Sequence, residues 1–274
     1  MKFKKKSQTI VATVFHKKAL KNIKNFFESL NTQKDKNFDL LVFNDGVSNI
    51  EKKFNTKINH KIINCHGSIN ENRINLINHC KKMNYKYLIF IDSDDYMDKK
   101  RVIVSKKYLK NYKIVVNDIN LISPTKKIIK KNFFSQRINN KSLLNINDIL
   151  DKNLIGMSNS SIRIQVLKKM KLKNLKDAPI FDWAFWFMIL RKNNAVFTNE
   201  TQTYYKANTP KKITSLIDND RTFDKNKKRQ KQIIFLNIKK NYAYFRRTKT
   251  NIKSPLKNNL FWWENNEMIA NGKV

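Results

Sequence analysis

Three carboxylates fall within four residues at the end of an apolar segment, where Asp92, Asp94 and Asp95 follow Tyr87-Leu-Ile-Phe-Ile. Consecutive apolar residues bounded by polar ones predict a strand covered on both faces of a sheet. Asp92 and Asp94 are two positions apart, so an extended backbone directs both side chains to one face. Oxygen ligands that converge in this way are typical of a site for a hard divalent cation. An alternative is that Asp94 and Asp95 cap a helix that begins near Asp98.

Strand-like and helix-like segments alternate over roughly the first 110 residues and must position these acids. The predicted strands cover residues 8–15, 38–43, 61–65 and 87–92, and the predicted helices cover residues 19–30, 72–83 and 98–109. This alternation predicts an α/β fold with a Rossmann-like, mainly parallel central sheet flanked by helices. Ligands of such sheets bind beyond the carboxyl ends of the strands, where the acids lie.

The alternation weakens after residue 110. We expect strands at 114–116 and 128–129, a helix over 143–154, an extended piece over 156–164, an aromatic-rich helix over 180–190 and a last strand over 195–205. No Gly/Ser linker interrupts these segments, so residues 1–220 are interpreted as one domain. Residues 221–274 are interpreted as a basic, aromatic C-terminal helical extension, which either lies on a membrane surface or packs on the domain.

Charge and cysteine content limit the environment and the partners. The formal net charge is +36, which permits an anionic membrane surface, phosphate-bearing substrates or nucleic acid. We do not expect nucleic acid, because acids at strand ends repel phosphate unless a cation intervenes. Cys65 and Cys80 suit a reducing compartment, and no apolar stretch reaches transmembrane length. We expect a cytoplasmic protein, with peripheral binding to the inner face of the cytoplasmic membrane as an open alternative.

Several landmarks in order resemble the family 2 glycosyltransferases of the GT-A fold. They cover about residues 7 to 215, and a set in order is far more specific than a lone Asp-x-Asp. They are Thr9-Ile-Val-Ala-Thr-Val in the first strand, Ser29-Leu-Asn-Thr-Gln before the second, Asn44-Asp45-Gly46, Asn72-Arg73, Asp92-Ser-Asp94-Asp95, Phe181-Asp182-Trp183 and Tyr204-Tyr-Lys206. Phe181 stands where the family has Glu.

The resemblance implies a role for each matching residue. Asp45 would bind the nucleotide base, Asp92 would lie by the ribose, and Asp94, with Asp92, would hold Mn²⁺ or Mg²⁺ on the diphosphate. Asp182 would be the catalytic base. His16, at a strand end, and Arg73, at a helix start, are further candidates for nucleotide binding, although a loop or solvent role is open for both. Trp183 is a candidate for stacking on an acceptor sugar, although core packing is an alternative.

The implied activity is transfer of one sugar from a nucleotide-diphosphate sugar to a glycan or lipid-linked acceptor, by metal-assisted inverting displacement, in cell-surface polysaccharide or lipopolysaccharide synthesis. Three alternatives stay open. The domain could be a catalytically impaired GT-A-like nucleotide-binding protein, or a basic nucleic-acid-binding protein. A haloacid-dehalogenase-like phosphatase also has Asp-x-Asp after a buried strand, but that motif normally opens the chain, whereas Asp92 follows three earlier predicted strands.

Overall fold

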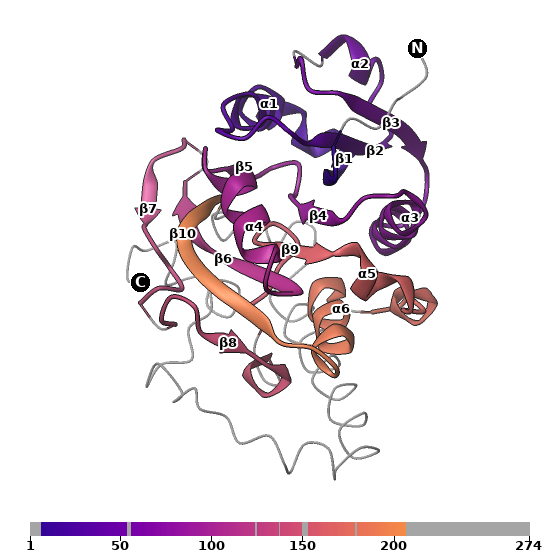
Figure 1. Cartoon of the computed structure of the whole chain (residues 1–274). Coiled ribbons are helices and arrows are strands. Elements are labelled where there is room, and N and C mark those ends of the chain that lie inside the picture. The colour runs from indigo at the N-terminus through magenta and orange to yellow at the C-terminus, as the bar shows by residue number, and fades with distance from the viewer. Residues whose placement is uncertain are drawn as a thin grey trace, which may run out of the picture.

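In the computed structural model, the chain folds around a mixed sheet with helices on both faces (Figure 1). In the part of the chain that it describes, the strands run in the order β3-β2-β1-β4-β9-β6-β10-β5, with β7 beside β6 and β8 beside β10. The described residues are 7–53, 56–123, 125–136, 138–149, 153–178 and 180–206.

The first half of the sheet is parallel. β1 (Thr9–His16) lies between β2 (Asp39–Asp45) and β4 (Tyr87–Phe90), and β3 (His60–Cys65) continues the sheet beyond β2. Most residues of β1, β2 and β4 are buried, as is usual for strands with helices on both faces. The carboxyl ends of these strands share one edge, so the polar residues that follow them meet there.

Alternate residues of the strands enter two separate cores. Val11 of β1 packs in the core under α1 (Ile23–Asn31), whereas Ile10 packs in the core under α3 (Ile69–Lys82). The remaining helical elements are η1 (Lys17–Asn22), α2 (Ile50–Lys53), α4 (Arg101–Leu109), η2 (Ile146–Ile149), α5 (Ile164–Lys168), η3 (Lys173–Leu175) and α6 (Phe181–Leu190). The period-2 alternation of a strand therefore supplies both faces of the sheet with apolar contacts.

The second half of the sheet mixes directions. β9 (Ser160–Arg163) runs antiparallel to β4 on one side and to β6 (Ile114–Ile122) on the other, and β6 pairs in parallel with β10 (Ala195–Lys206). Three short strands complete it, namely β5 (Tyr96–Met97), β7 (Ile128–Lys130) and β8 (Leu143–Leu144). The prediction of an α/β fold with a largely parallel central sheet is confirmed, while the antiparallel insertion of β9 was not predicted.

The described residues of the segment 143–154, namely 143–149 and 153–154, do not form the predicted helix. Leu143 and Leu144 pair with β10, and η2 covers only Ile146–Ile149. The Asn145 carboxamide oxygen accepts a hydrogen bond from the Asn147 N–H at 2.8 Å, and the Asn145 N–H donates to the Asp148 carboxylate at 2.7 Å. Side chains that bond nearby backbone in this way compete with helix formation. The spacing of apolar residues therefore predicted the wrong element.

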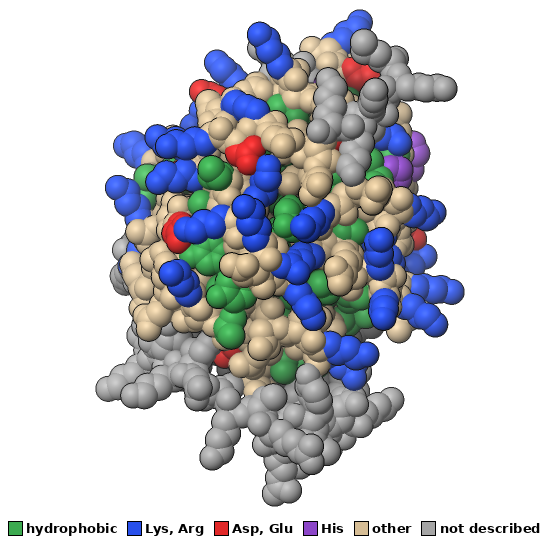
Figure 2. All heavy atoms as spheres, in the orientation of Figure 1, with side chains coloured by type: hydrophobic (Ala, Val, Ile, Leu, Met, Phe, Trp, Pro, Cys, Tyr) green, Lys and Arg blue, Asp and Glu red, His purple; other side chains and the backbone are tan. Residues whose placement is uncertain are grey.

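Basic side chains are spread over the visible face of the protein with few acids between them (Figure 2). Within the described ranges, no helix is long and apolar enough to cross a membrane. The predicted extension over residues 221–274, and the domain boundary at residue 220, lie outside the residues that the structure describes.

Candidate active site

The acidic loop, which we define as residues 92–95, lies just after β4, at the carboxyl edge of the parallel strands. The Asp92 N–H donates to the Ser158 hydroxyl at 2.9 Å, and the Asp95 carboxylate accepts the backbone N–H of Lys206 at 2.9 Å. Asp95 is buried, whereas Asp92 and Asp94 are partly exposed. The loop is therefore tied to the end of β10 through Asp95, and it presents Asp92 and Asp94 at the surface of the site.

The helix-capping alternative for Asp94 and Asp95 is wrong. The strand β5 separates both residues from α4, which begins at Arg101. The residue that precedes this helix is Lys100, whose side chain makes no capping hydrogen bond, and the first-turn N–H of Val102 donates to the Gln33 side-chain oxygen at 3.0 Å. Asp98 instead accepts the backbone N–H of Lys100 at 2.8 Å. The acids after β4 consequently have no role in starting α4.

Burial and, after it, repulsion between the carboxylates set the electrostatics of the loop. Burial raises the pKa of Asp94, and the neighbouring Asp92 carboxylate raises it further, while His16 and Lys206 act in the opposite direction. Burial raises the pKa of Asp95 well above its usual range, and Asp94 and Asp92 add to this effect. One Asp95 oxygen, Oδ2, is buried without a hydrogen-bond partner among the described residues. Carboxylates that destabilise one another in this way fit a bound cation, which would offset the repulsion.

A divalent cation fits the loop only with help from other ligands. In the described ranges, no group of three or more His, Cys, Asp or Glu side chains is placed to hold a metal ion together. Asp92 and Asp94 supply carboxylate oxygens, which suit Mg²⁺ or Mn²⁺. Mg²⁺ characteristically binds through one or two carboxylates and completes its coordination with water and substrate phosphates. The residues present fit this type of site.

Arg73 connects the acidic loop to Asp182. Its guanidinium donates to Asp182 at 2.9 Å and to Asp92 at 3.4 Å, and it lies over the Phe181 ring at 5.6 Å from the centroid. Burial opposes the Arg73 charge, but Asp182 and Asp92 outweigh burial, so the pKa of Arg73 is raised. The structure therefore brings three of the predicted site residues into one ion-paired cluster.

The start of α3 positions Arg73. Ser68 and Glu71 form a capping box, in which the Ser68 hydroxyl accepts the Glu71 N–H and the Glu71 carboxylate accepts the Ser68 N–H. Asn72 is fully buried and hydrogen-bonds both the N–H and the carbonyl of Gly67, at 3.0 Å each. These contacts fix the first turn of the helix, and with it the point from which the Arg73 side chain extends.

Asp182 lies in the first turn of α6, where the helix dipole favours a negative charge. Its second oxygen accepts the backbone N–H of Met157 at 3.4 Å. Burial raises the pKa of Asp182, Arg73 lowers it, and Asp92 raises it. A carboxylate whose pKa is raised toward neutrality is a stronger base, so Asp182 is suited to accept a proton from a substrate hydroxyl.

Asp45 and His16 lie on adjacent strands at the same edge of the sheet, paired in register at the ends of β2 and β1. The Asn44 side chain closes the turn after β2 by bonding both the N–H and the carbonyl of Val47 at 3.0 Å. Gly46 has φ +72°, a conformation that favours glycine. Burial and the Asp45 charge raise the pKa of the Cys65 thiol to about 11. His16 acts on the acidic loop through its charge, which is felt at Asp94, and Asp45 lies beside His16 on the adjacent strand.

Trp183 does not lie at this site as predicted. It is 1% exposed, and its indole N–H donates to the Ile149 carbonyl at 2.6 Å. Trp186 is fully buried as well, with its ring 5.0 Å from that of Phe185. Both tryptophans belong to the core beneath α6, because neither has a ring face open to solvent. The predicted stacking of Trp183 on an acceptor sugar is therefore corrected to core packing.

Sequence reasoning missed three contributors to the site. The Ser158 hydroxyl accepts the backbone N–H of Asp92, and the Met157 N–H donates to the carboxylate of Asp182. Tyr205 lies close enough to Asp95, Asp94, Asp92 and Asp182 that these acids, after burial, raise its pKa well above the usual range. Its place in Tyr204-Tyr-Lys206 was the one available signal. Nothing in the sequence around Ser158 distinguished it from other polar residues in extended segments.

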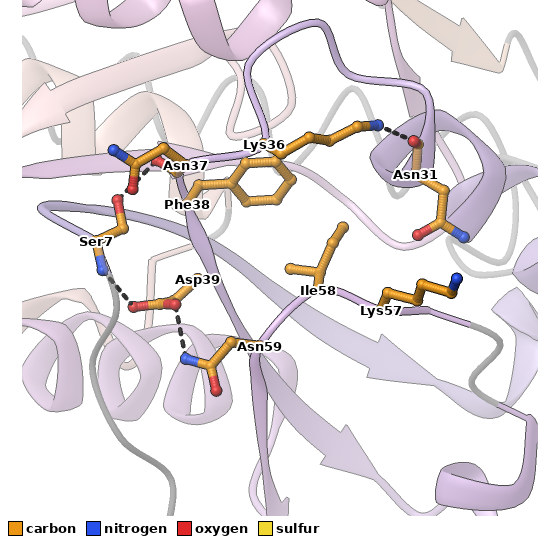
Figure 3. A pocket seen from close by; sticks show the side chains of 9 residues that line it. All are labelled: Ser7, Asn31, Lys36, Asn37, Phe38, Asp39, Lys57, Ile58 and Asn59. Atoms are coloured by element: carbon orange, nitrogen blue, oxygen red, sulfur yellow. Dashed lines mark hydrogen bonds between the residues drawn. The ribbon is translucent and has the colours of Figure 1, made fainter.

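A cavity of about 590 Å³ lies at the opposite edge of the sheet (Figure 3). It is lined by Ser7, which precedes β1, by Asp39, where β2 begins, and by Asn59, just before β3. The Asp39 carboxylate accepts hydrogen bonds from the Ser7 N–H, the Asn59 amide and the Tyr85 hydroxyl. Asp39 is therefore hydrogen-bonded within the protein. The cavity lies at the amino ends of the strands, whereas the ion-paired cluster lies at their carboxyl ends.

Solved structures share the fold. The crystal structure of S. aureus TarS 1–349 has a TM-score of 0.56 and 18% identity, over 76% of this chain and 63% of the TarS chain. The structure of the same protein in complex with UDP-GlcNAc has a TM-score of 0.56 and 15% identity, over 72% of this chain and 58% of the TarS chain. The structure in complex with UDP has a TM-score of 0.57 and 15% identity, over 76% of this chain and 63% of the TarS chain. The chain thus spans less than two thirds of these TarS chains. At such identities the likeness shows a common fold.

The sequence matches the model of one protein family, whereas a search of curated proteins finds no match. The family is described as glycosyl transferase family 2, and its match covers residues 9–178. That segment is more than half of the chain and contains Asp45, Arg73 and the acidic loop, and it ends just before Asp182. The chain belongs to glycosyl transferase family 2.

Proposed function

We propose that this protein transfers a single sugar from a nucleotide-diphosphate sugar to a hydroxyl group by inverting displacement. The observation that carries the proposal is the Arg73 pairing, which holds the candidate base Asp182 and the candidate metal ligand Asp92 on the two sides of one guanidinium. A direct displacement needs a base for the incoming hydroxyl and a positive environment for the departing diphosphate. The cluster combines both within one site.

One bond forms and one breaks at the anomeric carbon, and one proton is transferred. The acceptor oxygen bonds to the anomeric carbon as the bond between that carbon and the phosphate oxygen breaks, and Asp182 takes the hydroxyl proton. Arg73 keeps Asp182 ionised and oriented until the proton arrives. A Mn²⁺ or Mg²⁺ ion held by Asp94 and Asp92 would neutralise the charge that develops on the diphosphate. One base suffices, so the second carboxylate that a glycosidase requires is not needed.

The nucleotide is proposed to lie across the ends of β1 and β2. Asp45 would accept hydrogen bonds from the base, and His16 would lie between the base and Asp94, whose pKa it lowers. The complex of the similar S. aureus TarS structure with UDP-GlcNAc makes UDP-GlcNAc the first donor to test. Phe181, which stands where the family has Glu, lies under the Arg73 guanidinium, and measured turnover distinguishes an active enzyme from a purely nucleotide-binding protein.

The acceptor is proposed to be a glycan or lipid-linked molecule in cell-surface polysaccharide synthesis. The excess of Lys and Arg would favour an acceptor at an anionic membrane surface, with the protein on the inner face of the cytoplasmic membrane. Sedimentation with anionic vesicles at low salt tests the location. We propose that residues 221–274 contribute to this membrane binding. A protein that stays in the supernatant, or one whose sedimentation is unaffected by removal of residues 221–274, would contradict that role.

The enzymatic proposal is tested with a panel of nucleotide sugars and Mn²⁺, by measuring released nucleoside diphosphate and thermal stabilisation by the nucleotide. Asp94→Ala is expected to lose both signals, because it removes a metal ligand. Asp182→Asn is expected to keep the stabilisation and lose turnover, because an amide cannot take the proton. Metal-independent nucleotide binding by Asp94→Ala would contradict the assignment of Asp94.

A further inference from the structure

A pocket of about 200 Å³ lies beside Asp94, on the side where η1 and α1, the segment after β6 and the end of β10 come together. Three of its lining residues are lysines, namely Lys21, Lys126 and Lys206, and Asp94 is the one acid among the described residues that line it. This volume is below the 300 to 1,000 Å³ or so that is usual for whole small-molecule ligands. The pocket therefore suits one small charged group rather than a complete sugar nucleotide.

Two of the lysines are held in place by amides. The Lys206 ammonium donates to the Asn22 carboxamide oxygen at 3.0 Å, and the Lys126 ammonium donates to the Asn25 carboxamide oxygen at 2.8 Å. A neutral amide orients an ammonium group without cancelling its charge. Both asparagines also line the pocket, so the positive charges are fixed at its wall. Such an arrangement attracts an anion.

Asn22 offers a further donor. Its oxygen accepts the hydrogen bond from Lys206, while its amide nitrogen is buried and has no hydrogen-bond partner among the described residues. A buried donor left unpaired is destabilising, so a ligand oxygen placed there would relieve this cost. Fixed ammonium groups and an unpaired N–H donor together match the several acceptor oxygens of a phosphate group.

We propose that this pocket binds a phosphate group carried by one of the two substrates of the transfer reaction, a role that rests on the function proposed above. The phosphate belongs either to the diphosphate of the donor or to a phosphate-bearing acceptor. Both would enter beside Asp94. The phosphate is then bound by Lys21, Lys126 and Lys206. The carboxylates of Asp92 and Asp94 alone would repel it.

The test uses the full chain with Lys126→Met and Lys21→Met, which remove one charge each and keep an unbranched side chain. Lys24→Met is the matched control, because Lys24 is exposed on α1 next to Asn25 and does not line the pocket. Calorimetric titrations with Mg²⁺ present compare UDP, uridine and inorganic phosphate, the last both alone and with saturating UDP. If the donor panel identifies another base, its diphosphate and nucleoside replace UDP and uridine.

Two results support the proposal and identify the source of the phosphate. For a donor phosphate, Lys126→Met and Lys21→Met weaken UDP binding about tenfold or more and leave uridine binding unchanged, as expected for loss of a charge-assisted contact. For an acceptor phosphate, UDP binding is unchanged, and inorganic phosphate binds to the UDP complex of the wild-type protein but at least about tenfold more weakly to the two variants. Lys24→Met behaves as wild type in both cases.

The proposal is overturned if UDP binds the wild type and all variants equally while inorganic phosphate binds none of them or binds all of them equally. The proposed function would survive that result, because nucleotide binding persists. Conversely, failure of every nucleoside diphosphate to bind would remove the proposed function, while pocket-dependent binding of inorganic phosphate alone would still support the anion site. The two failures are therefore distinguishable.

Discussion

Replacing Arg73 by methionine should shift the pH dependence of catalysis. Methionine keeps an apolar contact with the Phe181 ring and removes the cation 2.9 Å from Asp182. An opposite charge this close typically lowers a carboxyl pKa by about 1–3 units. The guanidinium is shared with Asp92 at 3.4 Å and is 22% exposed, so both the second partner and the solvent weaken its effect on the pKa of Asp182.

The sign follows from the causes of the Asp182 pKa. Burial and Asp92 raise it and Arg73 lowers it, so loss of Arg73 raises it further. Asp182 works as a base only when it is ionised, and the acidic limb of the pH profile of kcat should therefore move to higher pH. Turnover at neutral pH falls, while turnover at high pH recovers toward the wild-type value.

The assay is release of nucleoside diphosphate at saturating donor, from about pH 5 to pH 9, a range chosen to bracket a raised carboxyl pKa. Arg163→Met serves as the control, because the Arg163 guanidinium donates to the carbonyls of Leu109 and Lys110, away from the acids. Equal acidic limbs for the wild type and Arg73→Met would refute the claim that Arg73 sets the ionisation of Asp182. A uniform loss of activity at every pH would instead indicate that Arg73 only positions the site.

Two further substitutions test assignments made from burial and backbone geometry. Trp183→Ala should lower the free energy of unfolding in urea by about 3–5 kcal/mol, because Trp183 is 1% exposed in the core, and nucleotide affinity of the folded fraction should not change. A selective loss of acceptor binding with unchanged stability would contradict the core assignment. Gly46→Ala should cost about 1 kcal/mol, because φ is +72° there and a Cβ would lie 3.3 Å from the Lys17 side chain. Chemical denaturation measures this loss, and an unchanged midpoint would show that the turn relaxes freely.

The parallel half of the sheet was predictable because its signals are local. Each of its strands is an apolar run that ends in polar or turn-forming residues, so the strand ends at Asp45 and Asp92 could be placed from spacing alone. The edge at which these acids meet then followed from the geometry of parallel strands. Asp45, Asp92, Asp94 and His16 were found for the same reason, whereas the role of Asp182 came from the resemblance to the family and Arg73 was singled out at a helix start.

The missed features depend on contacts between distant segments. β9 was expected only as an extended piece, and its antiparallel place between β4 and β6 could not be inferred, because the sequence does not specify its partners. Trp183 and Asp182 are neighbours on one helix, yet the burial of Trp183 and the ion pair of Asp182 with Arg73 depend on what α6 packs against. Periodicity gives the element, and tertiary packing decides which of its residues reach the site.

The Arg73 cluster also bears on how the protein folds. Arg73 and Asp182 are 109 residues apart in the chain, and the contact between Lys206 and Asp95 spans 111. Closing loops of this length is entropically costly, so such contacts are gained late unless a folding nucleus includes them. Refolding should therefore restore helical signal before it restores nucleotide turnover, which makes catalytic competence a reporter of complete assembly of the domain.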